Sequence, residues 1–197
     1  AMYEGFYGLQ ERPFALLPDP SFLFLSKGHS TALTLLRYSI LNRQGFTVVS
    51  GEVGSGKTTL INCLLDELKS GVTVGLINFT TRSFGEMAEW IMMAYGLPYK
   101  NKSKVELYDD FVQFMIREYA AGRPVVLIVD EAQNLGIRGL EEIRMLSNVN
   151  AQKDYLLHVI LVGQPELRSL LQSPQLRQLT QRVSVAYHLK RLTEEEV

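Results

Sequence analysis

A glycine-rich segment at residues 51–58 carries the strongest chemical signal in the sequence. It fits the pattern G-x-x-x-x-G-K-[ST], in which glycines let successive backbone N–H groups turn toward phosphate oxygens, and reads Gly51-Glu52-Val53-Gly54-Ser55-Gly56-Lys57-Thr58. We expect Lys57 to reach the β- and γ-phosphates of a nucleotide and the Thr58 hydroxyl to bind Mg²⁺. Thr59 is expected to pack or to contact the α-phosphate. This Walker A pattern predicts ATP and Mg²⁺ as ligands; the alternative is a glycine-rich turn that binds nothing.

Two adjacent carboxylates follow an apolar run. Asp130 and Glu131 come directly after residues 125–129, a run typical of a central parallel strand buried on both faces. At the end of such a strand Asp130 would hold Mg²⁺ or one of its waters, which is the Walker B role. Glu131 would orient or deprotonate an attacking water. The pair predicts hydrolysis as well as binding, whereas the alternative for Glu131 is a solvated loop position.

The run Asp130-Glu131-Ala132-Gln133 also resembles the DEAH-type box of nucleic-acid helicases. A helicase core needs a second motor domain with its own arginine motifs, and too few residues follow Gln133 to form one. We therefore do not favour a helicase.

Three further polar residues are candidates for catalysis. If the strand expected at residues 156–162 lies between the P-loop strand and the carboxylate strand, Gln164 points its amide at the γ-phosphate or the attacking water, a sensor 1 position. Arg177 and Arg182 precede the last expected strand, and one of them could act in trans on the nucleotide of a neighbouring subunit. We favour Arg182 for that role. The alternative for either arginine is a solvated helix end.

The elements that must position these residues alternate between β-branched runs and helical periodicity, which indicates an α/β fold with a parallel sheet covered on both faces. Five strands are expected, at residues 46–50, 73–78, 125–129, 156–162 and 183–189. One helix is predicted directly after the P-loop and extends to Leu68. Four more helices are predicted at residues 84–95, 108–119, 140–148 and 166–172.

The domain organisation follows from these elements. We expect residues 2–45 to be an N-terminal segment with a first helix that packs on the core, and residues 46–191 to be the core itself. Thr193 is followed by glutamates, a helix-start signature, so residues 192–197 are expected to begin a truncated helical lid.

Composition narrows the function classes. The 197 residues are 46% hydrophobic and 21% charged, which is typical of a globular domain. Lys and Arg total 20 against 21 for Asp and Glu, so the strong basic signature of an obligate nucleic-acid binder is missing. No apolar run is long enough to span a membrane. The lone Cys63 cannot form an intrachain disulfide, which favours a reducing compartment, the cytoplasm.

The motifs together resemble those of AAA+ ATPases. More narrowly, three N-terminal segments are similar to the general secretion pathway protein A (ExeA-like) family, whose relatives serve exosortase and pilus systems: residues 3–9, Arg12-Pro13-Phe14 and residues 18–24. The resemblance implies sheet order 5-1-4-3-2 with strands numbered along the chain, a lid with a sensor 2 arginine, and ATP-dependent assembly of identical subunits into a ring. It also implies secretion or envelope partners, and peripheral attachment to the inner membrane through further parts or partners.

Two rival functions share these motifs. One is a DNA-dependent AAA+ ATPase that assists transposition or replication-type loading, which the balanced charge does not favour. The other is a nucleotide-gated scaffold that hydrolyses ATP negligibly. The resemblance also implies an adenine pocket near Phe22, Leu23, Phe24 and His29, although packing is expected for most of the aromatics and a helix-start or surface position for His29.

Overall fold

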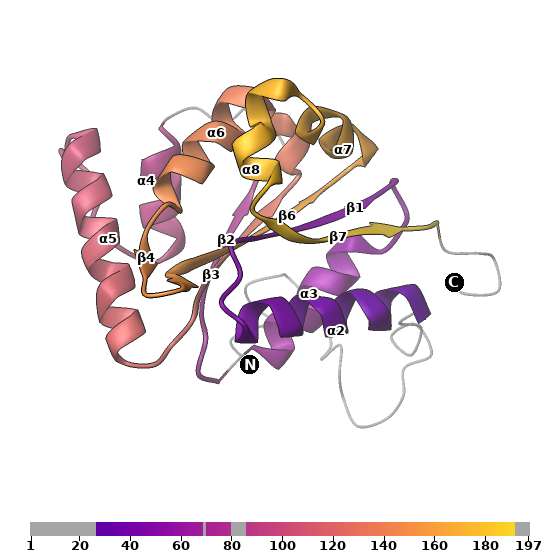
Figure 1. The fold of residues 1–197 in the computed structure, drawn as a ribbon, viewed down its shortest axis with the longest axis horizontal. Coiled ribbons are helices and arrows are strands. Elements are labelled where there is room, and N and C mark those ends of the chain that lie inside the picture. Colours follow the sequence, from indigo (N-terminus) through magenta and orange to yellow (C-terminus); the bar gives the residue numbers. More distant parts are fainter. Residues whose placement is uncertain (1–26, 69, 80–85, 192–197) are drawn as a thin grey trace.

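The computed structural model describes residues 27–68, 70–79 and 86–191. Its centre is a five-stranded parallel sheet in which the strand order is β2-β3-β6-β1-β7 (Figure 1). The strands run over Phe46–Gly51 (β1), Thr73–Asn78 (β2), Val125–Asp130 (β3), Leu157–Gly163 (β6) and Val183–Leu189 (β7). Numbered as the five expected strands, this order is 5-1-4-3-2 read from β7, so the predicted fold class and sheet order are confirmed.

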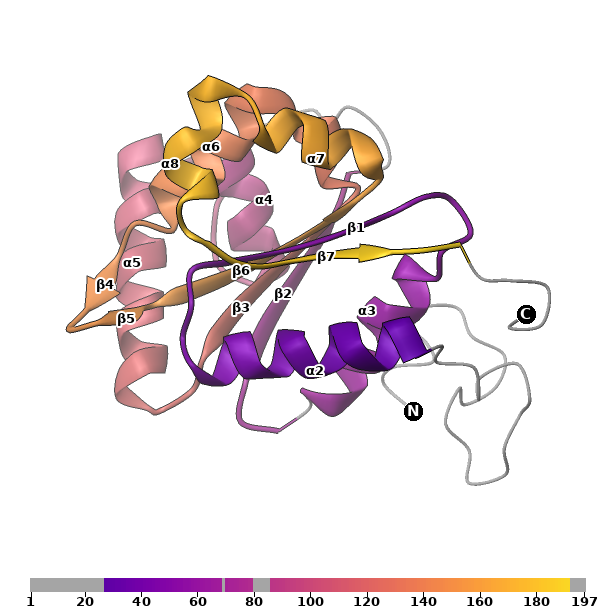
Figure 2. The ribbon, with the colours of Figure 1, turned by 45° about the vertical axis from the view of Figure 1, so that its right-hand side comes forward.

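Helices cover both faces of the sheet, as Figures 1 and 2 show. One face carries α2 (Lys27–Leu41) and α3 (Lys57–Glu67). The other carries α4 (Met87–Ala94), α5 (Lys104–Ala120), α6 (Gly136–Leu146), α7 (Pro165–Leu171) and α8 (Arg177–Thr180). Two short 3-10 turns, η1 (Ala132–Leu135) and η2 (Pro174–Leu176), precede α6 and α8. The result is a three-layer arrangement.

Strand β3 shows why helices must cover both faces of the sheet. Side chains alternate between the two faces of a strand, and here both sets are apolar. Val125, Leu127 and Val129 enter the hydrophobic cluster under α4–α7, whereas Val126 and Ile128 enter the cluster under α2 and α3. All five side chains are buried, and each contributes roughly 1.5–3 kcal/mol relative to exposure. The apolar run thus fixes the strand that carries the two carboxylates.

Helix α2 packs on the core. Ala32, Leu33, Leu36 and Ile40 recur at helical spacing along α2 and are buried against α3 and β7. The expected N-terminal segment before α2, the aromatic part of the adenine pocket and the start of the lid lie outside the described residues. Within the described ranges, no helix has the length and apolar character that a membrane span requires.

The fold differs from the sequence-based expectation in several places; α6, for example, covers Gly136–Leu146, whereas a helix was expected at residues 140–148. A two-stranded antiparallel hairpin, β4 (Asn150–Ala151) and β5 (Asp154–Tyr155), precedes β6 and was not predicted. Helix α5 begins before residue 108, because Ser103 and Glu106 form a capping box: the Ser103 hydroxyl accepts from the Glu106 N–H, and the Glu106 carboxylate accepts from the Ser103 N–H. The capping box thus adds a turn to the predicted helix.

Candidate functional site

The P-loop, the two carboxylates and Gln164 lie at the same edge of the sheet, whereas Arg182 precedes β7 at the opposite edge. In a parallel sheet the carboxyl ends of all strands lie at the same edge, where ligands bind in open α/β folds. β1 leads there into the P-loop, β3 ends at Asp130 and β6 ends at Gly163, just before Gln164. β6 pairs with β1 on one side and with β3 on the other. The condition that the sequence set for Gln164, a strand between the P-loop and the carboxylates, is therefore met.

Two glycines of the P-loop allow contacts that a side chain would block. Gly56 has φ +81°, in the left-handed region, and a Cβ there would lie 2.3 Å from His29 Nε2. A Cβ on Gly51 would lie 2.3 Å from Ser55 Oγ. His29 is 1% exposed, so the expected helix-start position in α2 is correct but the surface position is wrong. Helix α2 therefore packs against the P-loop through His29.

The Lys57 side chain folds back onto the P-loop. It is the first residue of α3 and is buried, and its ammonium group donates to the Gly51 carbonyl at 2.6 Å and to the Glu52 carbonyl at 2.9 Å. Glu52 itself forms an exposed ion pair with Arg191 at 3.0 Å, just after β7. The side chains of Thr58 and Thr59 are exposed at the start of α3. Phosphate oxygens at this loop would offer Lys57 an anionic alternative to its two carbonyl partners.

Ser55 supplies an independent sign that the loop is built for a ligand. Its hydroxyl is fully buried, and within the described part of the chain it has no hydrogen-bond partner. A buried polar group without a partner costs roughly 1–3 kcal/mol. A bound anion could accept from this hydroxyl, so the donor set of the loop fits a phosphate group.

Asp130 lies at the tip of β3 with few compensating charges. It accepts from the Glu131 N–H at 2.8 Å and faces the Asn78 amide at 3.4 Å. Burial raises the pKa of Asp130, and the neighbouring charge of Glu131 raises it further, while the N–H bond and the charge of Lys57 lower it. A partly buried carboxylate with a raised pKa is suited to binding a cation. Mg²⁺ typically takes one or two protein carboxylates together with substrate phosphates, so Asp130 and the Thr58 hydroxyl fit as candidate ligands.

No group of three or more metal-ligating side chains occurs in the described ranges. That observation leaves the candidate site for Mg²⁺ with the two protein ligands already named.

Glu131 has an unusual backbone and a defined partner. Its φ of +53° places it in the left-handed region, which non-glycine residues rarely adopt. Its carboxylate accepts from Gln133 Nε2 at 2.5 Å, and Gln133 Oε1 accepts from the Gln164 N–H at 3.1 Å. Sequence reasoning gave no role to Gln133 or to Asn78. The only available signal was their place, directly after or at the end of a predicted strand.

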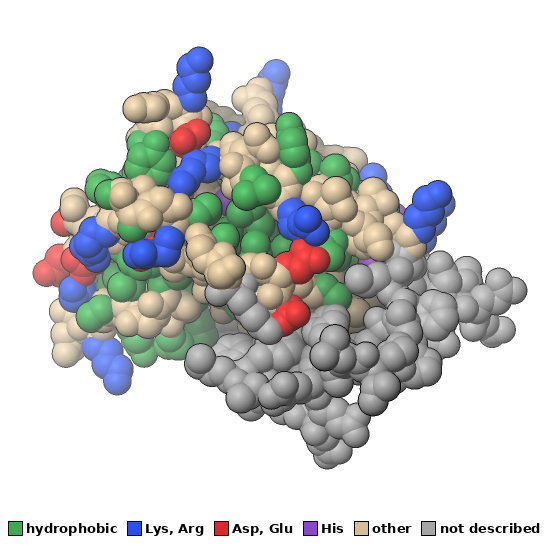
Figure 3. All heavy atoms as spheres, turned by 90° about the horizontal axis from the view of Figure 1, so that it is seen from below, with side chains coloured by type: hydrophobic (Ala, Val, Ile, Leu, Met, Phe, Trp, Pro, Cys, Tyr) green, Lys and Arg blue, Asp and Glu red, His purple; other side chains and the backbone are tan. Residues whose placement is uncertain are grey.

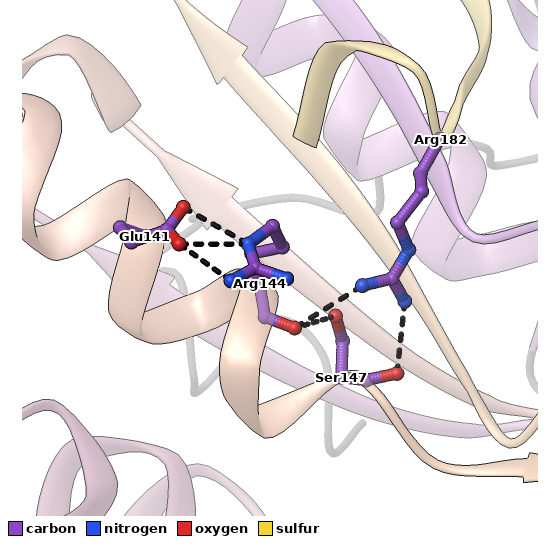
Figure 4. A network of polar contacts seen from close by, with 4 residues as sticks. All are labelled: Glu141, Arg144, Ser147 and Arg182. Atoms are coloured by element: carbon purple, nitrogen blue, oxygen red, sulfur yellow. Dashed lines mark hydrogen bonds and ion pairs between the residues drawn. The ribbon is translucent and has the colours of Figure 1, made fainter. Parts of the chain in front are cut away.

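The two candidate arginines lie in different surroundings. The Arg182 guanidinium donates to the Arg144 carbonyl at 3.2 Å and to the Ser147 carbonyl at 3.0 Å (Figure 4), and it stacks 4.5 Å from the centre of the Tyr155 ring. Burial lowers its pKa from the ordinary arginine value. Arg177 is exposed on α8. These contacts occupy Arg182 within its own chain and favour Arg177 as the arginine that can reach a neighbour.

Comparison with known proteins gives three kinds of similarity. A family model described as AAA domain matches residues 40–171. General secretion pathway protein A of Aeromonas hydrophila is 38% identical over all 197 residues, which span 36% of that protein. This confirms the resemblance seen in the motifs, and it leaves the greater part of the relative's length without a counterpart in the chain.

Several of the structural neighbours are ORC and Cdc6 proteins. The ADP form of Aeropyrum pernix ORC2 matches with a TM-score of 0.64 and 18% identity, over 86% of this chain and 49% of that one. Cdc6p from Pyrobaculum aerophilum matches with a TM-score of 0.62 and 19% identity, over 86% of this chain and 47% of that one. Aeropyrum pernix ORC1 in complex with DNA matches with a TM-score of 0.60 and 18% identity, over 94% of this chain and 51% of that one. At this identity the similarity shows the shared fold.

Proposed function

Because the chain belongs to the AAA domain family, we propose that it binds ATP at residues 51–59 and hydrolyses it, in the service of a secretion or envelope-assembly system. One observation carries the proposal: the P-loop with Lys57 and the pair Asp130–Glu131 lie at the same edge of the sheet, separated by a single strand, β6. The family match and the 38% identical relative support it.

Binding would use the loop's own donors. Backbone N–H groups of residues 51–56, the positive end of the α3 dipole and the buried Ser55 hydroxyl all favour an anion. Lys57 would exchange its two backbone carbonyl partners for phosphate oxygens, a stronger, charge-assisted contact. Loss of the Lys57 ammonium would therefore weaken binding.

Hydrolysis would use the groups at the strand tips. Glu131 would accept a proton from the attacking water as its oxygen bonds to the γ-phosphorus and the bond to the β-phosphate oxygen breaks, which yields ADP and phosphate. The Gln164 amide would orient that water or the γ-phosphate. Thr58 and Asp130 would hold Mg²⁺, which when bound neutralises charge on the phosphates.

A neighbouring subunit would complete the site. An arginine supplied in trans stabilises the charge of the transition state and is worth about 10³–10⁵ in rate. We assign this role to Arg177 in preference to Arg182, because Arg177 is exposed and Arg182 is bound to Arg144 and Ser147 of its own chain. The assignment implies a ring or another assembly of identical subunits.

A phosphate-release assay tests the proposal. We expect turnover by the unmodified chain, weak ATP binding by Lys57→Ala, and normal binding without turnover by Glu131→Gln. Glu166→Gln is the matched control, because Glu166 is an exposed glutamate outside the site. Equal turnover in all variants would refute the proposal. ATP binding without any turnover in the unmodified chain would instead support a nucleotide-gated scaffold.

The DNA-dependent alternative has less support in this chain. The relative named for secretion shares 38% identity, whereas the DNA-bound neighbour shares 18%. On the face shown in Figure 3, the described lysine and arginine side chains are scattered among other side chains. Duplex-DNA binding measured at two salt concentrations separates the cases. Tight, steeply salt-dependent binding that ATP strengthens would favour work on DNA.

A further inference from the structure

We propose that Gln133 is a positioning residue that ties the carboxylate of Glu131 to the backbone at the end of β6. The proposal deepens the proposed ATP hydrolysis and rests on it. Its basis is a pair of hydrogen bonds: Gln133 Nε2 donates to Glu131 Oε2 at 2.5 Å, and Gln133 Oε1 accepts from the Gln164 N–H at 3.1 Å. One side chain thus connects the tip of β3 to the start of α7.

The chemistry of the two partners fixes the direction of the Gln133 amide. A backbone N–H only donates and an ionised carboxylate only accepts, so the oxygen must face Gln164 and the nitrogen must face Glu131. Both ends of the amide are therefore used. Asparagine is one methylene shorter, and a glutamate at this position would offer no donor and would place a second negative charge beside Glu131.

The end of β6 leaves room for this link. A Cβ on Gly163 would lie 2.5 Å from Gln133 Oε1, so any side chain at position 163 would displace the amide. Gly163 is buried at the last position of β6. The small residue at the end of β6 and the long amide side chain of η1 therefore form a matched pair.

The backbone of Glu131 depends on such restraints. Its left-handed φ of +53° turns the chain out of β3 into η1, and local contacts hold it there: its N–H donates to Asp130 Oδ1, and its carbonyl accepts from the Asn134 N–H at 3.0 Å. These bonds fix the main chain, whereas the Gln133 bond fixes the carboxylate. A displacement at Gln164 would therefore be transmitted to the carboxylate through Gln133.

Removing the link should slow catalysis and leave binding unchanged, because Lys57, Ser55 and the loop backbone form the phosphate cradle. Gln133→Met keeps the length and removes both hydrogen bonds. We expect kcat to fall by about tenfold, consistent with the loss of one charged hydrogen bond, with KM and the Kd for a non-hydrolysable ATP analogue within about twofold.

Two more variants sharpen the test. Gln133→Glu should lower kcat further, because the new negative charge faces Glu131. Gln113→Met is the matched control, an exposed glutamine on α5 for which no change is expected. An unchanged kcat in Gln133→Met would overturn the proposal. A parallel loss of analogue binding, kcat and thermal stability would also overturn it, since that is the result of a merely structural role.

A stability measurement separates this proposal from the proposed function. In urea unfolding, Glu131→Met and Gln133→Met each remove the same bond, so the double variant should lose less in midpoint than the two single losses together. Strictly additive losses would overturn the link. Absent turnover in the unmodified chain, combined with non-additive midpoints, would instead retain the link and count against ATP hydrolysis.

Discussion

His158 makes the stability of the domain dependent on pH in a predictable way. It lies in β6 and is buried, with Nδ1 against the Gln44 carbonyl and Nε2 at 3.1 Å from the Thr47 hydroxyl. Because a carbonyl only accepts, Nδ1 carries the hydrogen and Nε2 accepts from Thr47. The ring is therefore held neutral. Burial lowers the pKa of His158 from 6.5 to about 4, and the bond to Gln44 opposes this only in part.

The sign and size of the effect follow from that value. Between about pH 6.5 and pH 4 the unfolded chain binds a proton that the folded chain does not, so stability falls as the pH falls through this window. Lowering the pKa from 6.5 to about 4 corresponds to a stability loss of about 3 kcal/mol once the pH lies below this window. By pH 5 about 2 kcal/mol of this is already lost, out of the 5–15 kcal/mol of a typical domain.

Urea unfolding followed by circular dichroism at about pH 7.5 and about pH 5 tests this prediction. His158→Gln should be less stable at both values, and it should lose about 2 kcal/mol less than the unmodified chain between them. His188→Gln is the control for replacing a histidine outside the core, because His188 is exposed on β7 and hydrogen-bonds to the Ser50 hydroxyl at 3.0 Å. If His158→Gln and the unmodified chain lose the same stability over this interval, the buried neutral histidine is not the cause.

Three further predictions concern the site and its surroundings. Burial and Glu131 raise the pKa of Asp130, so its ionised form costs stability at neutral pH; Asp130→Asn should raise the melting temperature of the nucleotide-free protein while turnover is lost, and a lower melting temperature would contradict this. Ser55→Ala should raise the melting temperature of the nucleotide-free protein, because it removes a buried hydroxyl that has no partner, and should weaken ATP-analogue binding about fivefold, the equivalent of one hydrogen bond of about 1 kcal/mol; unchanged affinity in a titration would exclude the hydroxyl as a ligand. Arg182→Met should cost about 2 kcal/mol in urea unfolding through its two carbonyl contacts, whereas Arg177→Met should remain within about 0.5 kcal/mol, and equal losses would remove the distinction between the two arginines.

The sequence was most informative where one local pattern decides the structure. The run at 125–129 is apolar at every position, which is typical of a strand buried on both faces, and the P-loop pattern predicted a strand before it and a helix after it. By contrast, the hairpin at 150–155 contains no β-branched residue and gave no strand signal. Tyr155 of this hairpin stacks on Arg182. Such a contact between residues distant in sequence could not be read from the residues alone.

The same limit applies to the site. Gln133 could be assigned a role only once β6 was known to lie beside β3, because its partner Gln164 is remote in the sequence. Arg182 looked free because its partners are backbone carbonyls, which no side-chain pattern reveals. His29 looked like a surface residue because nothing in its neighbours shows that Gly56 approaches it. In each case the missing information was tertiary adjacency.

The insertion of β6 between β1 and β3 has a mechanical consequence. Neighbouring strands lie about 4.8 Å apart, so the backbone that leads into the P-loop and the backbone that carries the two carboxylates are separated by about 10 Å. All seven residues of β6 are buried between helices on both faces, which leaves this width little freedom to change. The middle strand therefore works as a fixed spacer. Backbone hydrogen bonds to β1 and β3 set this width, so a side-chain change such as Ile160→Val would leave the gap available to a triphosphate unchanged.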